Sequence, residues 1–424
     1  AIIFFLLLVL MLTGMPISIS LGLTVLTFLF GFTQVPLESV ALKLFTGIEK
    51  FEIMAIPFFI LAGNFLTHGG VARRMINFAA SMVGHWYGGL GLGGVLACAL
   101  FAAVSGSSPA TVVAIGSILL PAMVKAGFPK SFGAGVITTS GALGILIPPS
   151  IVMVMYSVAT NTSVGALFMA GVVPGLALAG VLAGVTWYRA KKYDYPRLPK
   201  ASWLERLKAF KESAWGLLLI VIVMGGIYTG LFTPTEAAAM SAVYAFIVAV
   251  FVYKDMGLKD VPRVLLNSAN MSAMLLYIIT NAVLFSFIMT NENIPQSLAD
   301  WMLGNGLGPI AFLLAVNVIL LLAGNFMEPS SIVLIFAPIL FPVAVKLGID
   351  PVHFGIIMVV NMEVGMCHPP VGLNLYVASG ITKMGITELT VAVWPWLLAM
   401  VGFLMVVTYW PGLSLWFPRW LGMM

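Results

Sequence analysis

The chain has 424 residues, of which 61% are hydrophobic and only 8% are charged. Soluble domains carry roughly 25% charged residues, so this composition excludes a soluble globular protein and indicates one that lies within a lipid bilayer. The formal net charge of +5 is concentrated in one segment and does not indicate nucleic-acid binding. The two cysteines, Cys98 and Cys367, match no disulfide framework or metal site, and we expect no organic cofactor.

Apolar runs of about 20 residues recur along the chain, a length that suits helices crossing a hydrocarbon core roughly 30 Å thick. We expect an all-α polytopic membrane protein, because a β-barrel would show short alternating segments instead. The first run, over 2–32, predicts one helix that is tilted or kinked near Pro16. A segment of mixed polarity over 35–51 is typical of an interfacial helix. A short span over 53–67 and an arm with aromatic anchors over 71–87 follow.

Two pairs of short helices come next. Segments 90–104 and 109–124 are too short to cross alone, since a span needs about 20 residues, and Ser-Gly-Ser-Ser joins them. They predict a re-entrant hairpin. Segments 132–143 and 150–159 flank a Gly- and Pro-containing break at 144–149, so they predict one interrupted helix, and a full span over 164–188 follows.

A basic linker over 189–212 then divides the chain nearly in half. Residues 189–211 hold eight Lys and Arg residues against Asp194 and Glu205, and the positive-inside rule places such a segment in the cytoplasm. The second half predicts spans over 214–231 and 237–253, an arm and span over 264–289, an amphipathic segment over 294–303, a hairpin (309–323 and 329–345), an interrupted helix (354–365 and 371–378) and a last span over 389–410.

The two halves match at one fixed offset. Six residues are identical to the residue 221 positions later, namely Pro121, Lys125, Gly127, Gly144, Pro148 and Pro149, which indicates an internal duplication. We expect a first repeat over 1–188 (scaffold and arm helices 1–88, hairpin and broken helix 89–160, span 164–188) and a second over 213–424 (scaffold and arm helices 213–304, hairpin and broken helix 308–380, span 386–418). Counting crossings from the linker places the first hairpin's ends inside and the second's outside, so the repeats are inverted. Inverted repeats with interrupted helices are typical of secondary transporters.

Each break in a helix exposes backbone carbonyls on one side and amides on the other. Carbonyls and hydroxyls at such breaks coordinate Na⁺ in secondary transporters, and we expect two Na⁺ sites, one at Ser105, Ser107, Gly144 and Pro148, the other at Gly324, Asn325, Gly365 and Pro369. The positive N-terminal ends of half-helices suit an anionic substrate. Prolines mark four such starts, at Pro109, Pro149, Pro329 and Pro370, and Ser108 is a candidate cap. The alternative is that these Gly, Pro and Ser residues only kink and pack membrane helices.

Four stretches carry a resemblance to a known family: SGSSPATVVAIGSILLPAMVKAGF, GALGILIPPSIVMVMY, FAPILFPVAVKLGIDPVHFGIIMVVN and HPPVGLNLYVASGI. The chain resembles the large membrane subunit of tripartite ATP-independent periplasmic (TRAP) transporters over nearly its whole length. The resemblance implies a bacterial inner-membrane protein, Na⁺ coupling, and an elevator mechanism in which hairpins and broken helices move across a static scaffold. It also implies a periplasmic binding protein that delivers an organic acid, and a small membrane subunit. We expect that subunit on a separate chain, because this sequence has no spare N-terminal helices.

The chain departs from the family pattern at two positions. Many relatives have Asp before the second hairpin's proline and Thr before the second Pro-Pro pair, where this chain has Glu328 and His368. A carboxylate inside a membrane is a functional candidate by default, although Glu328 is equally a candidate helix cap. We expect Ser108, Glu328, His368 and Asn374 to contact the substrate, and His368 has a packing role as its alternative. The context CHPPVGLNLY slightly favours sialic acid over a C4-dicarboxylate.

Other classes of function fit less well. An ATP-driven pump needs a GxxxxGK[ST] loop, which the sequence lacks. Residues 103–106 faintly resemble the GxSG motif of an intramembrane serine protease, but Ala103 replaces its first glycine. An intramembrane aspartyl protease is excluded, because all five Asp residues lie outside the apolar runs. A scaffold protein or an ion channel explains the matched breaks poorly. The nearest alternative to a TRAP subunit is a stand-alone Na⁺/dicarboxylate symporter, so we expect a transporter and not an enzyme.

Overall fold

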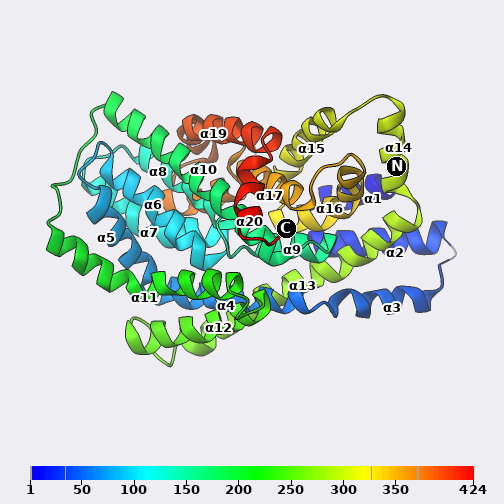
Figure 1. Cartoon of the computed structure of the whole chain (residues 1–424), viewed down its shortest axis with the longest axis horizontal. Helices are drawn as coiled ribbons and strands as arrows, with labels where there is room; N and C mark the ends of the chain where they lie inside the picture. Colours follow the sequence, from blue (N-terminus) through cyan, green and yellow to red (C-terminus); the bar gives the residue numbers. More distant parts are fainter. Residues whose placement is uncertain (1, 34, 326, 370–371) are drawn as a thin grey trace.

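The computed structural model describes residues 2–33, 35–325, 327–369 and 372–424, and the regular elements among them are all helical (Figure 1). Within these residues, eight segments are long and apolar enough to cross a bilayer: Phe51–His68, Ser108–Lys125, Val164–Lys192, Trp203–Tyr228, Pro234–Val252, Val261–Asn291, Pro329–Lys346 and Ile386–Tyr409. The expected all-helical polytopic fold is therefore confirmed. Pro370 and Val371, which we expected at the start of a half-helix, lie outside the described residues.

The first half of the chain forms ten α-helices and two 3₁₀ turns in its described part: α1 (Ile2–Leu12), α2 (Ile17–Phe32), α3 (Leu37–Ile48), η1 (Phe51–Met54), α4 (Ala55–His68), α5 (Val71–Val83), α6 (Gly89–Ser105), α7 (Ser108–Lys125), α8 (Lys130–Ser140), η2 (Gly141–Ile145), α9 (Ile151–Thr160) and α10 (Val164–Lys192). The single helix expected over 2–32 is divided into α1 and α2. Pro16 immediately precedes α2, and a proline disfavours helical geometry in the residue before it.

The basic linker is shorter than expected. Helix α10 continues to Lys192 and the next helix begins at Trp203, so the irregular segment spans only 193–202 instead of 189–212. Lys and Arg are good helix formers, which lets the basic residues extend both helices. Ser202 begins the second one through a capping box with Glu205, in which each side chain accepts a hydrogen bond from the other residue's backbone N–H.

The second half forms α11 (Trp203–Tyr228), α12 (Pro234–Ile247), the π-helical turn η3 (Val248–Val252), α13 (Val261–Asn291), α14 (Ile294–Gly304), α15 (Pro309–Gly324), α16 (Pro329–Lys346), α17 (Pro351–Cys367), α18 (Leu373–Thr382), α19 (Ile386–Tyr409) and α20 (Gly412–Trp420). The last span expected over 386–418 is divided, because α19 ends at Tyr409 and Pro411 precedes a separate short helix, α20.

The helices repeat at the same offset as the sequence motifs. Helix α16 begins and ends 221 positions after α7, and both have 18 residues. Figure 1 shows α5, α6 and α7 toward one end of the molecule and α14, α15 and α16 toward the other. The correspondence is incomplete at α13. Shifting α3, η1 and α4 by 221 positions brings them onto α13, which is a single unbroken helix of 31 residues.

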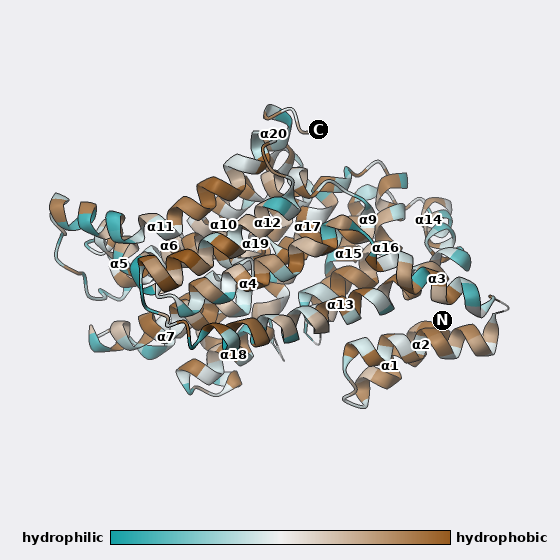
Figure 2. Ribbon diagram, turned by 90° about the horizontal axis from the view of Figure 1, so that it is seen from below, coloured by the Kyte–Doolittle hydropathy of each residue, from teal (hydrophilic) through white to brown (hydrophobic). Residues whose placement is uncertain are grey.

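The packing separates a peripheral layer from a buried centre. In the peripheral layer, α4 packs along α12 and α13, and α2 and α3 pack along α13. In the centre, every residue of α17 after Pro351 is buried, and so are the large side chains Phe132, Tyr156 and Phe354. Figure 2 shows hydrophobic residues along the long helices, with hydrophilic ones gathered toward connecting segments. This distribution suits a protein surrounded by lipid.

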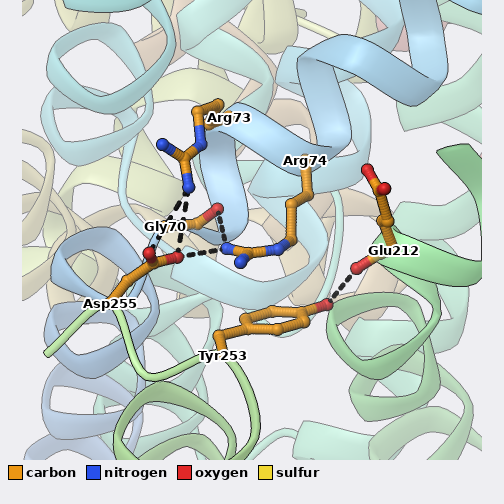
Figure 3. Close-up of polar contacts among 6 residues, drawn as sticks. All are labelled: Gly70, Arg73, Arg74, Glu212, Tyr253 and Asp255. Atoms are coloured by element: carbon orange, nitrogen blue, oxygen red, sulfur yellow. Dashed lines mark hydrogen bonds and ion pairs between the residues drawn. The ribbon is translucent and has the colours of Figure 1, made fainter.

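A polar cluster fixes α5 to α11 and to the loop after α12 (Figure 3). Arg74 forms an ion pair with Asp255 and donates to the carbonyl of Gly70 at 3.0 Å. Its guanidinium lies 3.8 Å from the centre of the Tyr253 ring, and the Tyr253 hydroxyl donates to the backbone carbonyl of Glu212 at 2.6 Å. The cluster therefore anchors the N-terminal end of α5.

Candidate functional site

The tips of the two hairpins meet at one cavity of about 370 Å³, a size within the usual range of small-molecule sites. We call it the tip cavity. Residues 106–110 line it from the first hairpin and 328–330 from the second. The rest of its wall consists of Asn64, Thr67, Val113, Ile145, Ile151, Val152, Met271, Met274, Leu275, Met366 and Leu373. Segments more than 200 positions apart in the chain thus form one site.

Four helices begin at this cavity. The first turns of α7, α9, α16 and α18 all contribute to its wall, through Pro109, Ile151, Pro329 and Leu373 among others. The first four backbone N–H groups of a helix have no acceptor within the helix, and each N-terminus carries the equivalent of roughly half a positive charge. The only charged side chain among the described lining residues is Glu328. Backbone amides are therefore the main positive groups of the tip cavity.

The first expected Na⁺ site is brought together in part. A Cβ atom on Gly144 would lie 2.6 Å from the backbone of Ser107, so η2 touches the tip of the first hairpin so closely that only glycine fits. The Ser105 hydroxyl lies 2.9 Å from that of Thr111, and the N–H of Ser107 points to it at 3.5 Å. Ser105, Ser107 and Gly144 are thus neighbours, with Thr111 as a hydroxyl that our sequence reasoning missed.

Pro148 is placed differently from our expectation. It lines a separate apolar cavity between α6, α10, α11 and α20, beside residues such as Leu100 and Phe417. The reason is local: η2 ends at Ile145, and Ser150 caps α9 by accepting from the N–H of Met153. Helix α9 therefore starts at Ile151, two positions after Pro149, which we expected to mark its start.

The second expected site shows the same kind of close approach. A Cβ on Gly324 would lie 3.0 Å from the Cα of Gly365, and one on Gly365 would lie 3.2 Å from the Cα of Gly324. The Asn325 side-chain oxygen lies 2.9 Å from Nδ1 of His368. Gly324, Asn325 and Gly365 thus lie close to one another, and Pro369 directly follows His368 in the non-helical segment after α17.

The break in the second interrupted helix lies later than expected. Helix α17 runs without interruption through Gly365 to Cys367, whereas the break in the first repeat begins at Gly141 with η2. The first segment holds Gly141 and Gly144, where the second has Met362 and Gly365. With one glycine fewer, the second segment stays helical as far as Cys367. The residues after it precede prolines, and a proline disfavours helical geometry in the residue before it.

The expected substrate contacts divide into two groups. Ser108 and Glu328 line the tip cavity, and Glu328 occupies the N-cap position of α16, where it accepts a hydrogen bond from the Ser331 hydroxyl at 3.2 Å. Asn374 is fully buried and hydrogen-bonded to Ser108, and His368 is paired with Asn325. Asn374 and His368 therefore position the wall instead of lining it. The cap of α7 is Ser107, not Ser108, and its side chain makes no capping hydrogen bond.

Sequence reasoning missed the peripheral wall of the cavity. Asn64 and Thr67 come from α4, and Met271 and Met274 from α13. The side-chain amide of Asn64 donates to the Ser268 hydroxyl at 2.7 Å, which ties α4 to α13. A polar Asn inside the otherwise apolar run 53–66 was a signal that could have identified this wall.

Comparison with known proteins decides the family. A family model described as the DctM component of tripartite ATP-independent periplasmic transporters matches residues 4–413. The chain belongs to this family. It is therefore a TRAP transporter permease, a multi-pass protein of the bacterial inner membrane and not an enzyme. Membership in the TRAP family implies a periplasmic binding protein and a DctQ-type subunit as partners.

Individual relatives differ in their similarity to this TRAP permease. The C4-dicarboxylate TRAP transporter large permease protein DctM of Rhodobacter capsulatus is 77% identical over 100% of this chain and 99% of its own length. The sialic acid TRAP transporter large permease protein SiaM of Vibrio cholerae is 38% identical over 97% and 96%. The crystal structure of the YdaH transporter of Alcanivorax borkumensis shares the fold, with a TM-score of 0.58 over 85% of this chain and 86% of that one at 15% identity.

Proposed function

We propose that this TRAP permease imports C4-dicarboxylates together with Na⁺, by an elevator movement of its hairpins and broken helices. The observation that carries the proposal is the convergence of four helix N-termini on the tip cavity. Each terminus is equivalent to roughly +0.5 charge, so four of them present about +2, which matches the two carboxylates of a dicarboxylate better than the single carboxylate of sialic acid.

Sequence identity to known relatives also favours a C4-dicarboxylate as the substrate. The relative with 77% identity is named for C4-dicarboxylates, whereas the one named for sialic acid is only 38% identical. The slight preference for sialic acid that we drew from the CHPPVGLNLY context is therefore not supported.

Sodium coupling is supported by the groups at the two breaks. Ser105, Ser107 and Gly144 lie together at the first hairpin tip, and Gly324, Asn325 and Gly365 at the second. Backbone carbonyls freed at helix ends, together with hydroxyl and amide oxygens, are suitable Na⁺ ligands. A cation at either tip would also offset the negative charge of Glu328. This carboxylate lines the cavity that would hold an anionic substrate and would otherwise repel it.

The way the two layers meet supports the proposed elevator mechanism. The hairpins and broken helices supply most of the cavity wall, while α4 and α13 of the peripheral layer close its remaining side. We infer that the first group moves as a transport domain along a scaffold that includes α4, α12 and α13. The binding protein would deliver the substrate from the periplasm, and the small membrane subunit would be a separate chain.

Uptake by proteoliposomes tests the proposal. The purified chain is reconstituted with and without its small subunit, the binding protein and an inward Na⁺ gradient, and radiolabelled succinate and sialic acid are offered separately. We expect succinate uptake only when all components and the gradient are present. Sodium-driven succinate uptake by this chain alone would instead establish a stand-alone symporter, and uptake of sialic acid but not of succinate would refute the proposed substrate.

A further inference from the structure

A second polar cavity lies beside the tip cavity and shares none of its lining residues. It has a volume of about 340 Å³ and lies between α3, α9, α13 and α16. Its polar lining side chains are Lys43, Thr46, Lys50, Asn161, Ser286 and Thr290. We call this cavity the lysine cleft. Both charged residues among its described lining are cations, whereas Glu52 lines the adjoining cavity instead.

Three helices, α9, α13 and α16, line both the tip cavity and the lysine cleft. On α13, Ala282 of the cleft follows Leu275 of the tip cavity by seven positions, which corresponds to about 10 Å of helix. On α9, Val158 follows Val152, and on α16, Leu334 follows Ser330. All three steps lead in the same chain direction, so the two cavities lie in sequence along one interface between the transport domain and the scaffold.

Topology places the cleft on the periplasmic side of the tip cavity. The basic linker 193–202 is cytoplasmic by the positive-inside rule. Helix α10 therefore runs inward, so α9, which precedes it, ends toward the periplasm. Helix α13 also ends outward, since α11 and α12 cross between it and the linker. A substrate that arrives from the periplasm along this interface passes the lysine cleft before it reaches the tip cavity.

The two lysines of the cleft have different surroundings. Lys50 is held at the C-terminal end of α9, where its ammonium donates to the carbonyl of Val158 at 2.5 Å and to the side-chain oxygen of Asn161 at 2.8 Å. Lys43 is exposed, and its ammonium lies 5.6 Å from the centre of the Phe287 ring. Lys43 is thus the cation with donors to spare, because an ammonium has three.

We propose that the lysine cleft is an anion-binding site, separate from the tip cavity, that holds a carboxylate-bearing substrate on its way from the periplasm. Lys43 supplies the main positive charge, and the hydroxyls of Thr46, Ser286 and Thr290 supply neutral hydrogen bonds. An anionic lipid headgroup offers the same oxygen chemistry as the substrate. The identity of the anion as a dicarboxylate rests on the proposed function, whereas the site itself does not.

Thiol labelling tests the site without requiring transport. A Ser286→Cys variant of the full chain, with its small subunit in liposomes of zwitterionic lipid, is treated with thiol reagents of similar size that are anionic or neutral. The native Cys98 and Cys367 are buried and give a low background. We expect the anionic reagent to react several-fold faster than the neutral one, and Lys43→Gln to remove this preference. Lys346→Gln is the matched control, since Lys346 lies on the same side but pairs with Asp300 outside the cleft.

Added anions distinguish the two candidate ligands of the lysine cleft, the substrate and an anionic lipid headgroup. Protection of the Ser286→Cys thiol by succinate in zwitterionic liposomes identifies the substrate as the ligand, and protection only after anionic lipid is included identifies a headgroup. Both outcomes support an anion site. Equal labelling by anionic and neutral reagents, unchanged by Lys43→Gln, would overturn it. Because labelling does not depend on uptake, a chain that fails to transport succinate would contradict the proposed function and leave this test valid.

Uptake kinetics give a second readout. In Lys43→Gln we expect the KM for succinate to rise several-fold while kcat changes little, because the cleft lies before the tip cavity and takes no part in carrying the substrate across. Lys43→Arg should restore most of the affinity, since it restores the positive charge. A fall in kcat at unchanged KM would mean that Lys43 has a structural role and would reject the cleft as a substrate site.

Discussion

Ser108 and Asn374 form two hydrogen bonds with each other, at 2.8 and 3.0 Å, across 266 positions of the chain. Ser108 opens the second helix of the first hairpin, and Asn374 lies in the first turn of the second broken helix. Both side chains are fully buried. The pair therefore joins the two halves of the chain directly beside the tip cavity.

Removing both partners of this pair should cost less than the sum of the costs of removing each one alone. Asn374→Ala leaves the Ser108 hydroxyl without this partner, and an unsatisfied buried polar group costs about 1–3 kcal/mol. In a double-mutant cycle with Ser108→Ala, measured by equilibrium unfolding in detergent, we expect the double variant to be less destabilised than the sum of the single ones. Ser117→Ala, at an exposed position of α7, is the control. Strictly additive effects would show that the pair contributes no coupling.

The contact between Gly324 and Gly365 should not tolerate a methyl group. A Cβ at Gly324 would lie 3.0 Å from the backbone of α17, and such overpacking typically costs about 1–3 kcal/mol. We expect Gly324→Ala to lower the midpoint of thermal unfolding and to reduce succinate uptake strongly. Gly380→Ala on α18, where a Cβ meets open space, should leave both unchanged. Normal uptake by Gly324→Ala would show that the second hairpin tip can shift without loss of function.

Sodium dependence should be sensitive to the two hairpin tips. If Na⁺ is bound at each tip, Ser107→Ala and Asn325→Ala each disturb one site, and the Na⁺ concentration for half-maximal uptake should rise several-fold in each variant. The Ser117→Ala variant serves as the comparison. Unchanged sodium activation in both tip variants would remove the proposed coordination, although dicarboxylate transport itself would stand.

The two neighbouring arginines of α5 should differ in their contribution to stability. Arg74 contacts Asp255, the carbonyl of Gly70 and the Tyr253 ring, and its side chain is 17% exposed. The side chain of Arg73 is 56% exposed and reaches the two Asp255 oxygens only at 3.4 Å. We expect Arg74→Ala to reduce the free energy of unfolding by about 1–2 kcal/mol and Arg73→Ala by less than about 0.5 kcal/mol. Equal losses in equilibrium unfolding would contradict the role of Arg74 as the anchor of this helix.

Local patterns in the sequence identified the short helices of the two hairpins and two of the four expected proline starts, Pro109 and Pro329. The half-hairpin expected over 329–345 is α16, Pro329–Lys346, because proline at a helix start is a strong local signal. The second break was misplaced, because glycine inside a helix is tolerated when a neighbouring backbone packs against it, as Gly324 does against Gly365.

Contacts between distant segments could not be predicted in the same way. Nothing in the local sequence of Asn374 distinguishes a side chain that faces a substrate from one that pairs with Ser108. The wall formed by Asn64 and Met271 depends on how α4 and α13 pack together. Such packing is set by the whole fold, and a single sequence without its relatives carries little information about it.

The unbroken α13 and its divided counterpart, α3 to α4, differ in their resistance to bending. A continuous helix of 31 residues resists bending, because each turn is held by hydrogen bonds to the next. The corresponding segment, α3 to α4, is interrupted at residues 49–54, where the Lys50 ammonium donates a hydrogen bond to the carbonyl of Val158 near the end of α9. The two corresponding segments thus differ, because α13 is stiff whereas α3 and α4 meet at a joint. This asymmetry places the joint beside the lysine cleft, which Lys50 lines.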